Sequence, residues 1–534
     1  MKARSRCFVV LVFVVAAFSG CNTHLTVLSP AGSSPCEVEA EALDTSRPDA
    51  VVGDGTPQSC TEDGLNAALE VGGIIRFRCG ANPLTVTVST EKVITRDTVI
   101  DGGGIITLDG GGTSRLFVLV GSSSHPVSLT MQYLTLRGGR AAVTPASAGS
   151  SSRAGGGAVL QLGGSLVITD STLVDNDATE NGPDELGGAI CSLGGRLVIA
   201  RSVVQGNRAG AGGAVAVLGA ELTILRTQLT GNQAVGQGAG AQGIGGALLV
   251  AQEGQSVGLC QVTMSQNRAM TFGTAMHLQG IGGEVVTIEQ ASIVDNQSPE
   301  SGVATGGPAV FLGMVSARLR AVTVANNIGV LNPGVWVNGG TQASQAANIQ
   351  FTNVTIAGNQ VYRHSDPASD GVGAALWIEG VVHGELVNCT LAGNVGEFGS
   401  GIVHPGQLLV RNTIIANQGT NVWNPQNCSE LGEPVIPADG ACVLQWPAES
   451  LDGYLCVPGA VVADPMLGPL QDNGGFPATM MPNAASPAVG AGADCPATDA
   501  RGHARPERCT LGAVEADGTA VSCPTCAVVG PAVR

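Results

Sequence analysis

The sequence predicts an all-β solenoid, a parallel β-helix in which each coil of the chain adds one strand to each of several sheets. One observation is a twelve-residue unit that recurs nine times between residues 165 and 417 and always ends in Asn. A second is the composition: 78 of 534 residues are Gly, whereas only 13% are charged and 3% aromatic. Typical globular domains contain about 25% charged residues. A Gly-rich, aliphatic chain with an internal period is typical of a repeat protein.

Three positions of the unit keep their character in all nine copies. The fourth is always apolar, from Ile168 to Leu409, and so is the ninth, from Leu173 to Ile414. The twelfth is Asn throughout: Asn176, Asn207, Asn232, Asn267, Asn296, Asn327, Asn359, Asn394 and Asn417. Asn tolerates the left-handed backbone of a tight turn. Stacked about 4.8 Å apart, these amides can form a structural hydrogen-bonded ladder; a ligand-binding row of Asn is the alternative.

A second short apolar segment, opened by glycine, precedes many of the units. Gly156-Gly157-Ala158-Val159 and Gly187-Gly188-Ala189-Ile190 are the first two examples. Each period therefore holds three short β-prone pieces separated by Gly or Asn turns, without room for a helix. Parallel strands need long connections, and here the rest of the coil supplies them.

A solenoid needs a cover at each end, because the terminal coils expose the core and unpaired strand edges. Ser59-Cys60-Thr61-Glu62 fits a capping box, and residues 64–69 predict a short amphipathic helix over the first coil. We expect the β-helix with this N-terminal helical cap to span residues 56–418. A small disulfide-stapled module over 419–516 and a tail over 517–534 complete the chain.

The N-terminal segment is typical of an export signal. Residues 1–20 combine a positively charged start with an apolar stretch too short to span a bilayer. The next residue is Cys21, and Phe18-Ser19-Gly20-Cys21 resembles the bacterial lipobox, which implies a lipid on Cys21 and attachment to the outer membrane or cell surface. Ordinary cleavage with an unmodified Cys21 is the alternative. Residues 21–55 lack periodicity and predict a flexible tether.

Export gives the cysteines meaning, because disulfides persist outside the cytoplasm. Cys191, Cys260 and Cys389 lie within strand segments, and we expect them to be buried as small apolar residues. Seven others are candidates for disulfides, in two close pairs and one group of three from which at least one more bond is expected: Cys60 with Cys79, Cys495 with Cys509, and Cys428, Cys442 and Cys456. Connectivity within the group of three cannot be deduced from the sequence.

Several segments carry a family resemblance. SCTEDGLNAALEVGGIIRFRCG (59–80), DTVIDGGGIITLDGG (97–111) and the GGAI/GGAV segments resemble a widespread group of bacterial secreted proteins with a right-handed parallel β-helix. The GGAI segments with Asn-ending repeats are similar to those of the polymorphic outer-membrane proteins of chlamydiae. Residues 464–515 resemble the module named choice-of-anchor Q. The resemblance implies a surface protein, although no hydrophobic anchor follows the module, so the N-terminal lipid would replace it.

Composition and spacing exclude some functions. A net charge of −17 without a basic patch disfavours nucleic acid as a partner, and the scattered His residues predict no metal site and no cofactor. Glycoside hydrolysis needs two carboxylates about 5–9.5 Å apart. The eleventh position of the unit is Asp only in Asp175 and Asp295, four coils apart, and the sixth holds one acid, Asp170. We therefore expect no catalytic site on the strands.

The inserts between the repeats leave one alternative open. Glu180, Asp184 and Glu185 share an insert, and Arg201 and Arg226 lie nearby in the predicted stack, as a polysaccharide lyase would require; a solvated acidic loop is the preferred interpretation. The longest inserts, at 177–186, 233–244, 297–305 and 360–370, follow the Asn and would emerge along one edge.

The sequence thus predicts an exported surface lipoprotein with a structural or adhesive role, which presents this ridge of inserts to glycans or other surfaces. The expected partners are the membrane, through the lipid, and a cell-surface polysaccharide or another cell. A polysaccharide lyase or glycoside hydrolase on a β-helix scaffold is the alternative, and fold alone does not decide between them.

Overall fold

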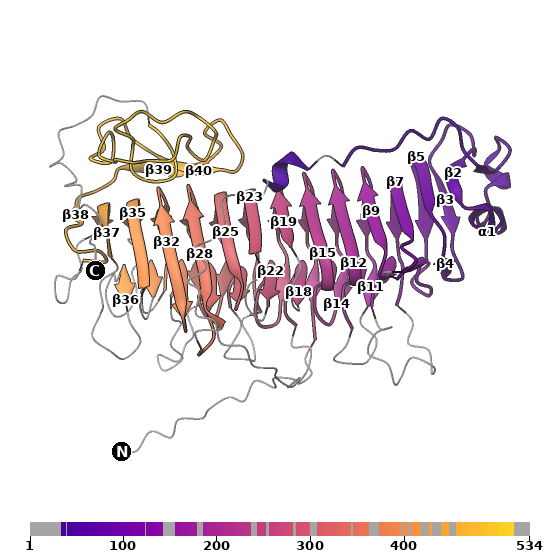
Figure 1. Ribbon diagram of the computed structural model, residues 1–534, viewed down its shortest axis with the longest axis horizontal. Helices are drawn as coiled ribbons and strands as arrows, with labels where there is room; N and C mark the ends of the chain where they lie inside the picture. The colour runs from indigo at the N-terminus through magenta and orange to yellow at the C-terminus, as the bar shows by residue number, and fades with distance from the viewer. Residues whose placement is uncertain are drawn as a thin grey trace, which may run out of the picture.

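The chain folds into a right-handed parallel β-helix, a long rod of stacked coils (Figure 1). The computed structural model describes residues 34–38, 40–122, 124–141, 155–178, 185–236, 243–251, 256–280, 285–299, 307–342, 345–362, 373–396, 399–403, 407–417, 427–429, 439–447 and 455–516. No helix within these residues is long and apolar enough to cross a membrane.

Three parallel sheets, named here a, b and c in the order of the chain, run along the rod. Sheet a contains β4 (Lys92–Ile94), β6 (Phe117–Val120), β8 (Val159–Leu162), β12 (Ile190–Ala200), β15 (Val215–Leu225), β18 (Leu248–Ala251), β22 (Met276–Gln279), β24 (Val310–Gly313), β27 (Val335–Asn338), β31 (Leu376–Glu379), β34 (Ile402–Val403) and β36 (Cys428–Ser429).

Sheets b and c share several long strands, because some strands bend around the corner between two sheets. Sheet b contains β2 (Gly73–Phe77), β5 (Thr98–Asp109), β7 (Ser128–Arg137), β9 (Ser165–Thr169), β19 (Val257–Cys260), β23 (Val285–Val294), β25 (Ser316–Ala325), β28 (Ala347–Thr352), β32 (Val382–Val387), β35 (Gln407–Ala416), β37 (Asp439–Trp446) and the second halves of β12 and β15. Sheet c adds β3 (Leu84–Thr87), β10 (Thr172–Val174), β13 (Val203–Gln205), β16 (Gln228–Thr230), β20 (Thr263–Ser265), β29 (Thr355–Ala357), β33 (Thr390–Ala392) and β38 (Val461–Val462).

Left-handed residues form the corners between the sheets. Gly194 and Gly195 have φ of 76° and 85° where β12 turns from sheet a into sheet b. In the preceding coil, Asp170, with φ of 50°, forms the corner between β9 in sheet b and β10 in sheet c. Asp175, with φ of 54°, follows β10 and precedes Asn176. Gly and Asn or Asp adopt this conformation most readily, which explains why the repeat has glycine and polar residues at these positions.

The interior is filled by the apolar columns of the repeat. Among the first eight predicted copies, the fourth and ninth residues pair with their equivalents from one coil to the next, and the ninth copy differs. In the last copy, Leu386 pairs with Val410 and Leu391 with Ile415. The prediction that Leu409 and Ile414 lie in these columns is therefore wrong by one residue. This coil lacks the left-handed residue that precedes Asn in the other units, so the apolar positions move one residue closer to it.

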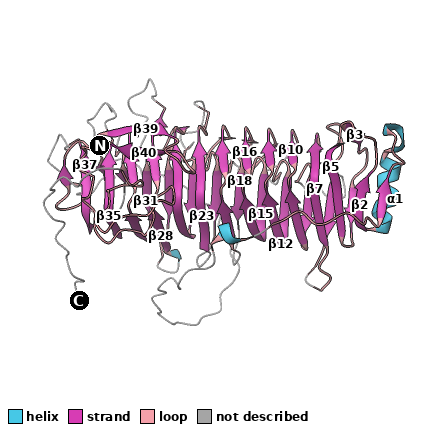
Figure 2. Cartoon of the chain, turned by 90° about the horizontal axis from the view of Figure 1, so that it is seen from above, coloured by secondary structure: helices cyan, strands magenta, loops and turns pink. Residues whose placement is uncertain are grey.

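The N-terminal end is covered by α1 (Glu62–Val71), as the sequence predicts, and Figure 2 shows this helix in cyan at one end of the rod. The capping residue differs from the prediction: Thr61, not Ser59, accepts the hydrogen bond from the Gly64 amide, at 3.2 Å. Ser59 instead accepts from the Asp54 amide in the preceding turn. Glu62 does not complete a capping box, because its carboxylate accepts hydrogen bonds from Lys92 and Ser89.

The predicted tether is wrong from residue 34 onward. These residues form a strap that runs along the rod from its middle back to the N-terminal cap (Figure 1). It begins with η1 (Pro35–Glu37) and ends with β1 (Ala50–Val52), which pairs with β2. Leu43 exchanges two hydrogen bonds with the Gln132 side chain, at 2.9 and 3.0 Å. The strap was missed because it has no repeat period and lies mainly on the outside of the coils, although Val52 at its end is buried in the core.

The predicted boundary at residue 418 is also misplaced. β37 pairs with β35, and β38 pairs with β37, so the β-helix continues to about residue 462. The separate C-terminal part, 464–516, contains one antiparallel pair, β39 (Leu467–Gln471) and β40 (Thr479–Pro482). It lies on the outside of the last coils, on the same side of the rod as the strap (Figure 1).

Candidate functional site

The nine predicted asparagines form one continuous buried column. In each coil the Nδ2 atom donates to the Oδ1 atom of the next Asn, as from Asn176 to Asn207 at 2.9 Å, and the backbone amide of Asn176 donates to the same oxygen at 3.0 Å. Nδ2 also donates backwards, to the Leu136 carbonyl at 3.1 Å. The column continues past the predicted end, because Asn417 donates to Asn427. Every amide is occupied by its neighbours, which leaves no free group for a ligand.

The edge that carries the inserts lies directly after this column. Short parallel strands follow the asparagines: β11 (Asp177–Ala178), β14 (Arg208–Ala209), β17 (Gln233–Ala234), β21 (Arg268–Ala269), β26 (Ile328–Gly329) and β30 (Gln360–Val361). The four predicted inserts leave the rod from this edge, and most of their residues lie outside the described part of the chain. Cys21, the rest of residues 1–33 and the tail over 517–534 lie outside it as well.

Several outward carboxylates on the sheets are matched with cations one coil away, whereas Asp295 and Glu379 lack such a pair in the described chain and burial raises the pKa of each. Asp109 pairs with Arg137, and Asp170 with Arg201 at 2.8 Å. The same relationship occurs between Glu289 and Arg320, at 3.5 Å, and between Glu385 and Arg411. The hydrogen bond from Arg201 lowers the pKa of Asp170. Carboxylates held ionised in this way are unsuited to act as general acids.

The structure describes three of the five residues of the lyase alternative, Glu185, Arg201 and Arg226. Arg201 is paired with Asp170, and Arg226 donates to Gln261 at 3.1 Å. Glu185 is only 6% exposed, so the expectation of a solvated loop is wrong at this residue. Glu180 and Asp184 lie outside the described residues. Within the described chain, no three His, Cys, Asp or Glu side chains are grouped so that they could hold a metal ion.

Disulfides tie the ends and the strap to the rod. The predicted candidates form Cys60–Cys79, Cys495–Cys509 and Cys428–Cys456, and Cys442 is disulfide-bonded as well. Cys260 was expected to be a free buried thiol, but it is bonded to Cys36 in the strap. Its side chain points out of sheet b rather than into the core. Cys191 and Cys389 are free and buried, as expected.

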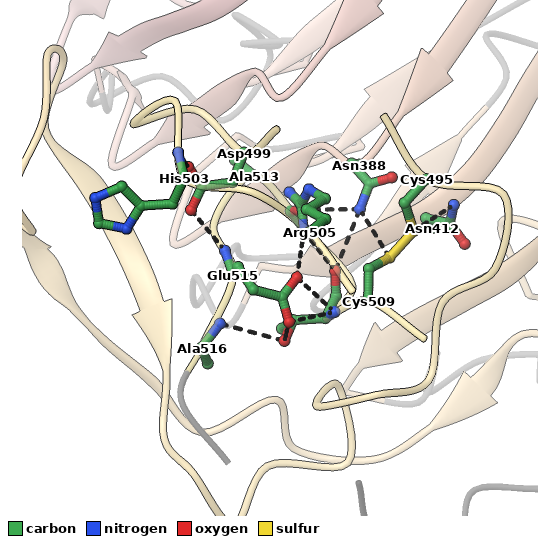
Figure 3. A network of polar contacts seen from close by, with 12 residues as sticks. Asn388, Asn412, Cys495, Asp499, His503, Arg505, Cys509, Ala513, Glu515 and Ala516 are labelled. Atoms are coloured by element: carbon green, nitrogen blue, oxygen red, sulfur yellow. Dashed lines mark hydrogen bonds and ion pairs between the residues drawn. A yellow bond between two sulfur atoms is a disulfide. The ribbon is translucent and has the colours of Figure 1, made fainter. Parts of the chain in front are cut away.

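The C-terminal part is held by the corner between sheets b and c. Asn353 Nδ2 donates to the Thr498 carbonyl at 2.8 Å, and Asn412 Nδ2 to the Ala493 carbonyl at 2.8 Å. Figure 3 shows the centre of this contact, where Asn388 Nδ2 donates to the Thr510 carbonyl at 3.2 Å. From Asp170 to Gln290 the upstream coils carry charged or Gln side chains at this corner, and Ala321 then packs against Ala513 of the docked part. The change to Asn in the next coils supplies donors for the docked backbone.

A buried charge network stabilises the docked part (Figure 3). Arg505, whose side chain is 1% exposed, pairs with Glu515 at 3.0 Å and donates to Asn353 Oδ1 at 3.1 Å. Asp499 accepts hydrogen bonds from the Arg501 guanidinium and from the Glu515 amide. Burial raises the pKa of Asp499, but these donors together lower it. This network is a structural clamp without an open cavity.

Sequence reasoning missed one unusual outward row, which lies on sheet a. His277, Phe311, Trp336 and Trp377 occupy the same register in β22, β24, β27 and β31. The rings of Trp336 and Trp377 stack at 4.5 Å with 2° between their planes, and His277 stacks on Phe311 at 4.5 Å. The signal was available, because each ring is on the second residue of its strand, two positions after a small residue: Ala275, Ala309, Gly334 and Ala375.

Comparisons with known proteins leave the chain without an assigned family. No protein-family model matches the sequence, and no curated protein matches it. Among solved structures, the chain is similar to pectate lyase Pel9A, with 12% sequence identity and a TM-score of 0.32 over 85% of this chain and 90% of that one. At this level, the similarity assigns no activity; the β-helix is established by the strand pairings themselves.

Proposed function

We propose that this protein is an exported, lipid-anchored surface rod with a structural or adhesive role. The observation that carries the proposal is the pairing of outward carboxylates with Arg one coil away, as in Asp170 with Arg201 and Glu385 with Arg411. An enzyme that cleaves polysaccharides by acid–base chemistry needs carboxylates poised for proton transfer. A rod with neutralised charge pairs, a ladder of amides and disulfide ties is suited to presenting a surface at a fixed distance.

The lipid anchor is tested by metabolic labelling with a radioactive fatty acid. The wild-type chain is expected to incorporate the label and a Cys21→Ser variant is expected to lose it. Equal incorporation in both would contradict the anchor. Cell fractionation of the same strains would then show whether the protein reaches the outer membrane.

The adhesive role is tested by binding the purified, fluorescent chain to whole cells before and after periodate oxidation of their surface glycans. We expect saturable binding that oxidation reduces. The enzymatic alternative is tested in parallel by incubation with pectin, alginate and chondroitin in the presence of calcium. A rise in absorbance near 232 nm (about the wavelength of an unsaturated uronate) or new reducing ends would show catalysis and overturn the proposal.

A further inference from the structure

The outer face of sheet a changes character along the rod. In the first half, the outward row reads Leu160, Cys191, Ala216 and Leu249, and apolar residues that precede the strands, Leu186 and Ile244, pack against it. From β22 onward the row becomes His277, Phe311, Trp336 and Trp377. Only 3% of the chain is aromatic, so four successive coils with a ring in one register form a distinct feature.

A second row changes at the same place. Two residues further along each strand, the first half carries Leu162, Leu193, Leu218 and Ala251. The second half carries Gln279, Gly313, Asn338 and Glu379. Rings therefore stand beside amide and carboxylate groups over the same coils. We call these two rows in β22, β24, β27 and β31 the aromatic–amide face.

The packing of the rings alone does not satisfy their polar atoms. His277 is 4% exposed, and within the described chain its Nδ1 atom has no hydrogen-bond partner, although Nε2 lies 3.1 Å from Gln279 Oε1. The indole N–H of Trp336, a residue 9% exposed, interacts with the Glu379 carboxylate but makes no hydrogen bond of standard geometry. Unpartnered buried polar groups are costly, so the row carries a cost that apolar side chains at these positions would not have.

The face remains partly open to solvent. Phe311 and Trp377 are half-buried, and Glu379 is exposed. The strap and the C-terminal part make their contacts elsewhere, on sheet b and at the corner between sheets b and c. The stacked rings turn their faces toward one another along the rod and present apolar edges beside polar neighbours. Such a surface suits ligands that combine C–H groups with a rim of hydroxyl groups. Sugars have this character.

Charge selects among the sugars. Of the eight residues that form the two rows, Glu379 is the one acid, and none is Lys or Arg. A polyuronide or a sulfated glycan would therefore meet a like charge without a compensating Lys or Arg. Amide and carboxylate oxygens instead accept hydrogen bonds from neutral hydroxyl groups. Because coils repeat about every 4.8 Å, a chain of sugars can lie along the row.

We infer that the aromatic–amide face is a binding site for a neutral glycan, with the sugar rings against Phe311 and Trp377 and hydroxyl groups at Asn338 and Glu379. This inference rests on the proposed surface function and names the ligand class for one defined face. The competing hypothesis is that the rings only stabilise the stacking of the coils. The two hypotheses predict different effects of a substitution at the rim: the binding hypothesis predicts a loss of glycan affinity, and the stacking hypothesis does not.

The test uses the full exported chain on an array of neutral glycans, with uronate and sulfated glycans alongside, followed by calorimetric titration of the strongest neutral oligosaccharide. We expect neutral glycans to bind. Trp377→Ala and Asn338→Ala are each expected to weaken binding about tenfold, the effect of losing one ring or hydrogen-bond contact. Trp377→Phe should retain most of the affinity. Tyr133→Ala removes a 39% exposed ring on β7 and serves as the matched control, with unchanged binding.

Thermal unfolding of each variant separates lost binding from lost folding. Asn338 Oδ1 accepts one part-buried hydrogen bond from the Gly340 amide, at 2.8 Å. Asn338→Ala should therefore lower the unfolding temperature only slightly, while its affinity falls about tenfold. The inference is overturned if the wild-type chain binds no neutral glycan, prefers anionic ones, or retains full affinity in folded Trp377→Ala and Asn338→Ala variants. Each of these results is compatible with cell binding through another surface, so the proposed adhesive role is judged separately by the whole-cell assay.

Discussion

Asn267 Nδ2 donates a hydrogen bond to Asn296 Oδ1 at 2.9 Å, and the Asn267 backbone amide donates to the same oxygen at 2.9 Å. In the preceding coil, Nδ2 and the backbone amide of Asn232 both donate to Asn267 Oδ1, at 3.0 and 2.9 Å. One side chain therefore satisfies polar groups in three successive coils. Each amide is fully buried, so the ladder couples neighbouring coils more tightly than a surface hydrogen bond would.

Asn267→Ala is expected to lower the free energy of unfolding by about 3–5 kcal/mol, because it leaves two buried donors of Asn232 and the Leu229 carbonyl without their partner. Chemical denaturation monitored by circular dichroism measures the change. Asn82→Ala, at an exposed position in a loop, is the matched control and should shift stability by less than about 0.5 kcal/mol. An equal effect at both positions would contradict the ladder's role.

Removal of the Cys36–Cys260 bond is expected to release the strap. The bond joins residues 224 apart in the sequence, and chain-entropy arguments assign about 5 kcal/mol to closing such a loop. In a Cys36→Ala/Cys260→Ala variant, residues 34–46 should become sensitive to proteases under native conditions. Cys191→Ala removes a free buried thiol and should leave protection of the strap intact. A strap that stays protected in the double variant would show that its hydrogen bonds suffice.

Glu62 and Lys92 link the N-terminal cap to the first coils, and Lys92 is 4% exposed. Burial raises the pKa of Glu62, but hydrogen bonds from Lys92 and Ser89 hold it at about 2. The carboxylate therefore stabilises the fold above pH 4.5, and this contribution is lost as the pH falls through 2. Glu62→Gln should cost about 2 kcal/mol at pH 7, discounted for solvent screening. In a double-mutant cycle, adding Lys92→Met should recover part of the loss.

His277 predicts a separate loss of stability in mild acid. Burial lowers its pKa to about 4 from 6.5, so between these values the unfolded chain binds a proton that the folded chain does not. Stability therefore falls as the pH drops from 6.5 to 4, by about 3 kcal/mol in total. Denaturation at several pH values measures the slope. His277→Phe keeps a ring against Phe311 and should remove this part of the slope; an unchanged slope would assign it to other groups.

Arg505 is expected to control docking of the C-terminal part. Arg505→Met leaves Glu515 without its charge partner and Asn353 Oδ1 without its donor, at a cost of about 3–5 kcal/mol for a buried pair. Hydrogen exchange over residues 464–516 should rise while the Asn ladder stays protected. Glu507→Gln changes an exposed neighbour and serves as the control. Loss of protection throughout the rod would show instead that docking and coil formation are one cooperative unit.

The interior of the protein could be predicted from sequence because it repeats. Apolar columns and Asn176 to Asn417 recur with each coil, so a local pattern implies a long-range contact. The outside does not repeat in the same way. No sequence pattern around Cys36 indicates that it pairs with Cys260. The strap becomes evident only in the structure, where the two cysteines meet on the outer face of sheet b. The aromatic row differs, because the equivalent strand positions of its rings can be read from the sequence. Trp336 and Trp377 are 41 residues apart, however, and their stacking appears only through the register of sheet a.

The position of the Cys36–Cys260 bond has a mechanical consequence. Any pull on the chain upstream of Ser34 reaches the rod first at Cys260, on β19, because the covalent bond bears the load before the strap or α1 can. The cap and the first coils are shielded from tension, and force enters the stack near its midpoint. Both ends of the rod then bear no tension, and the rod can rotate about this single attachment near its middle.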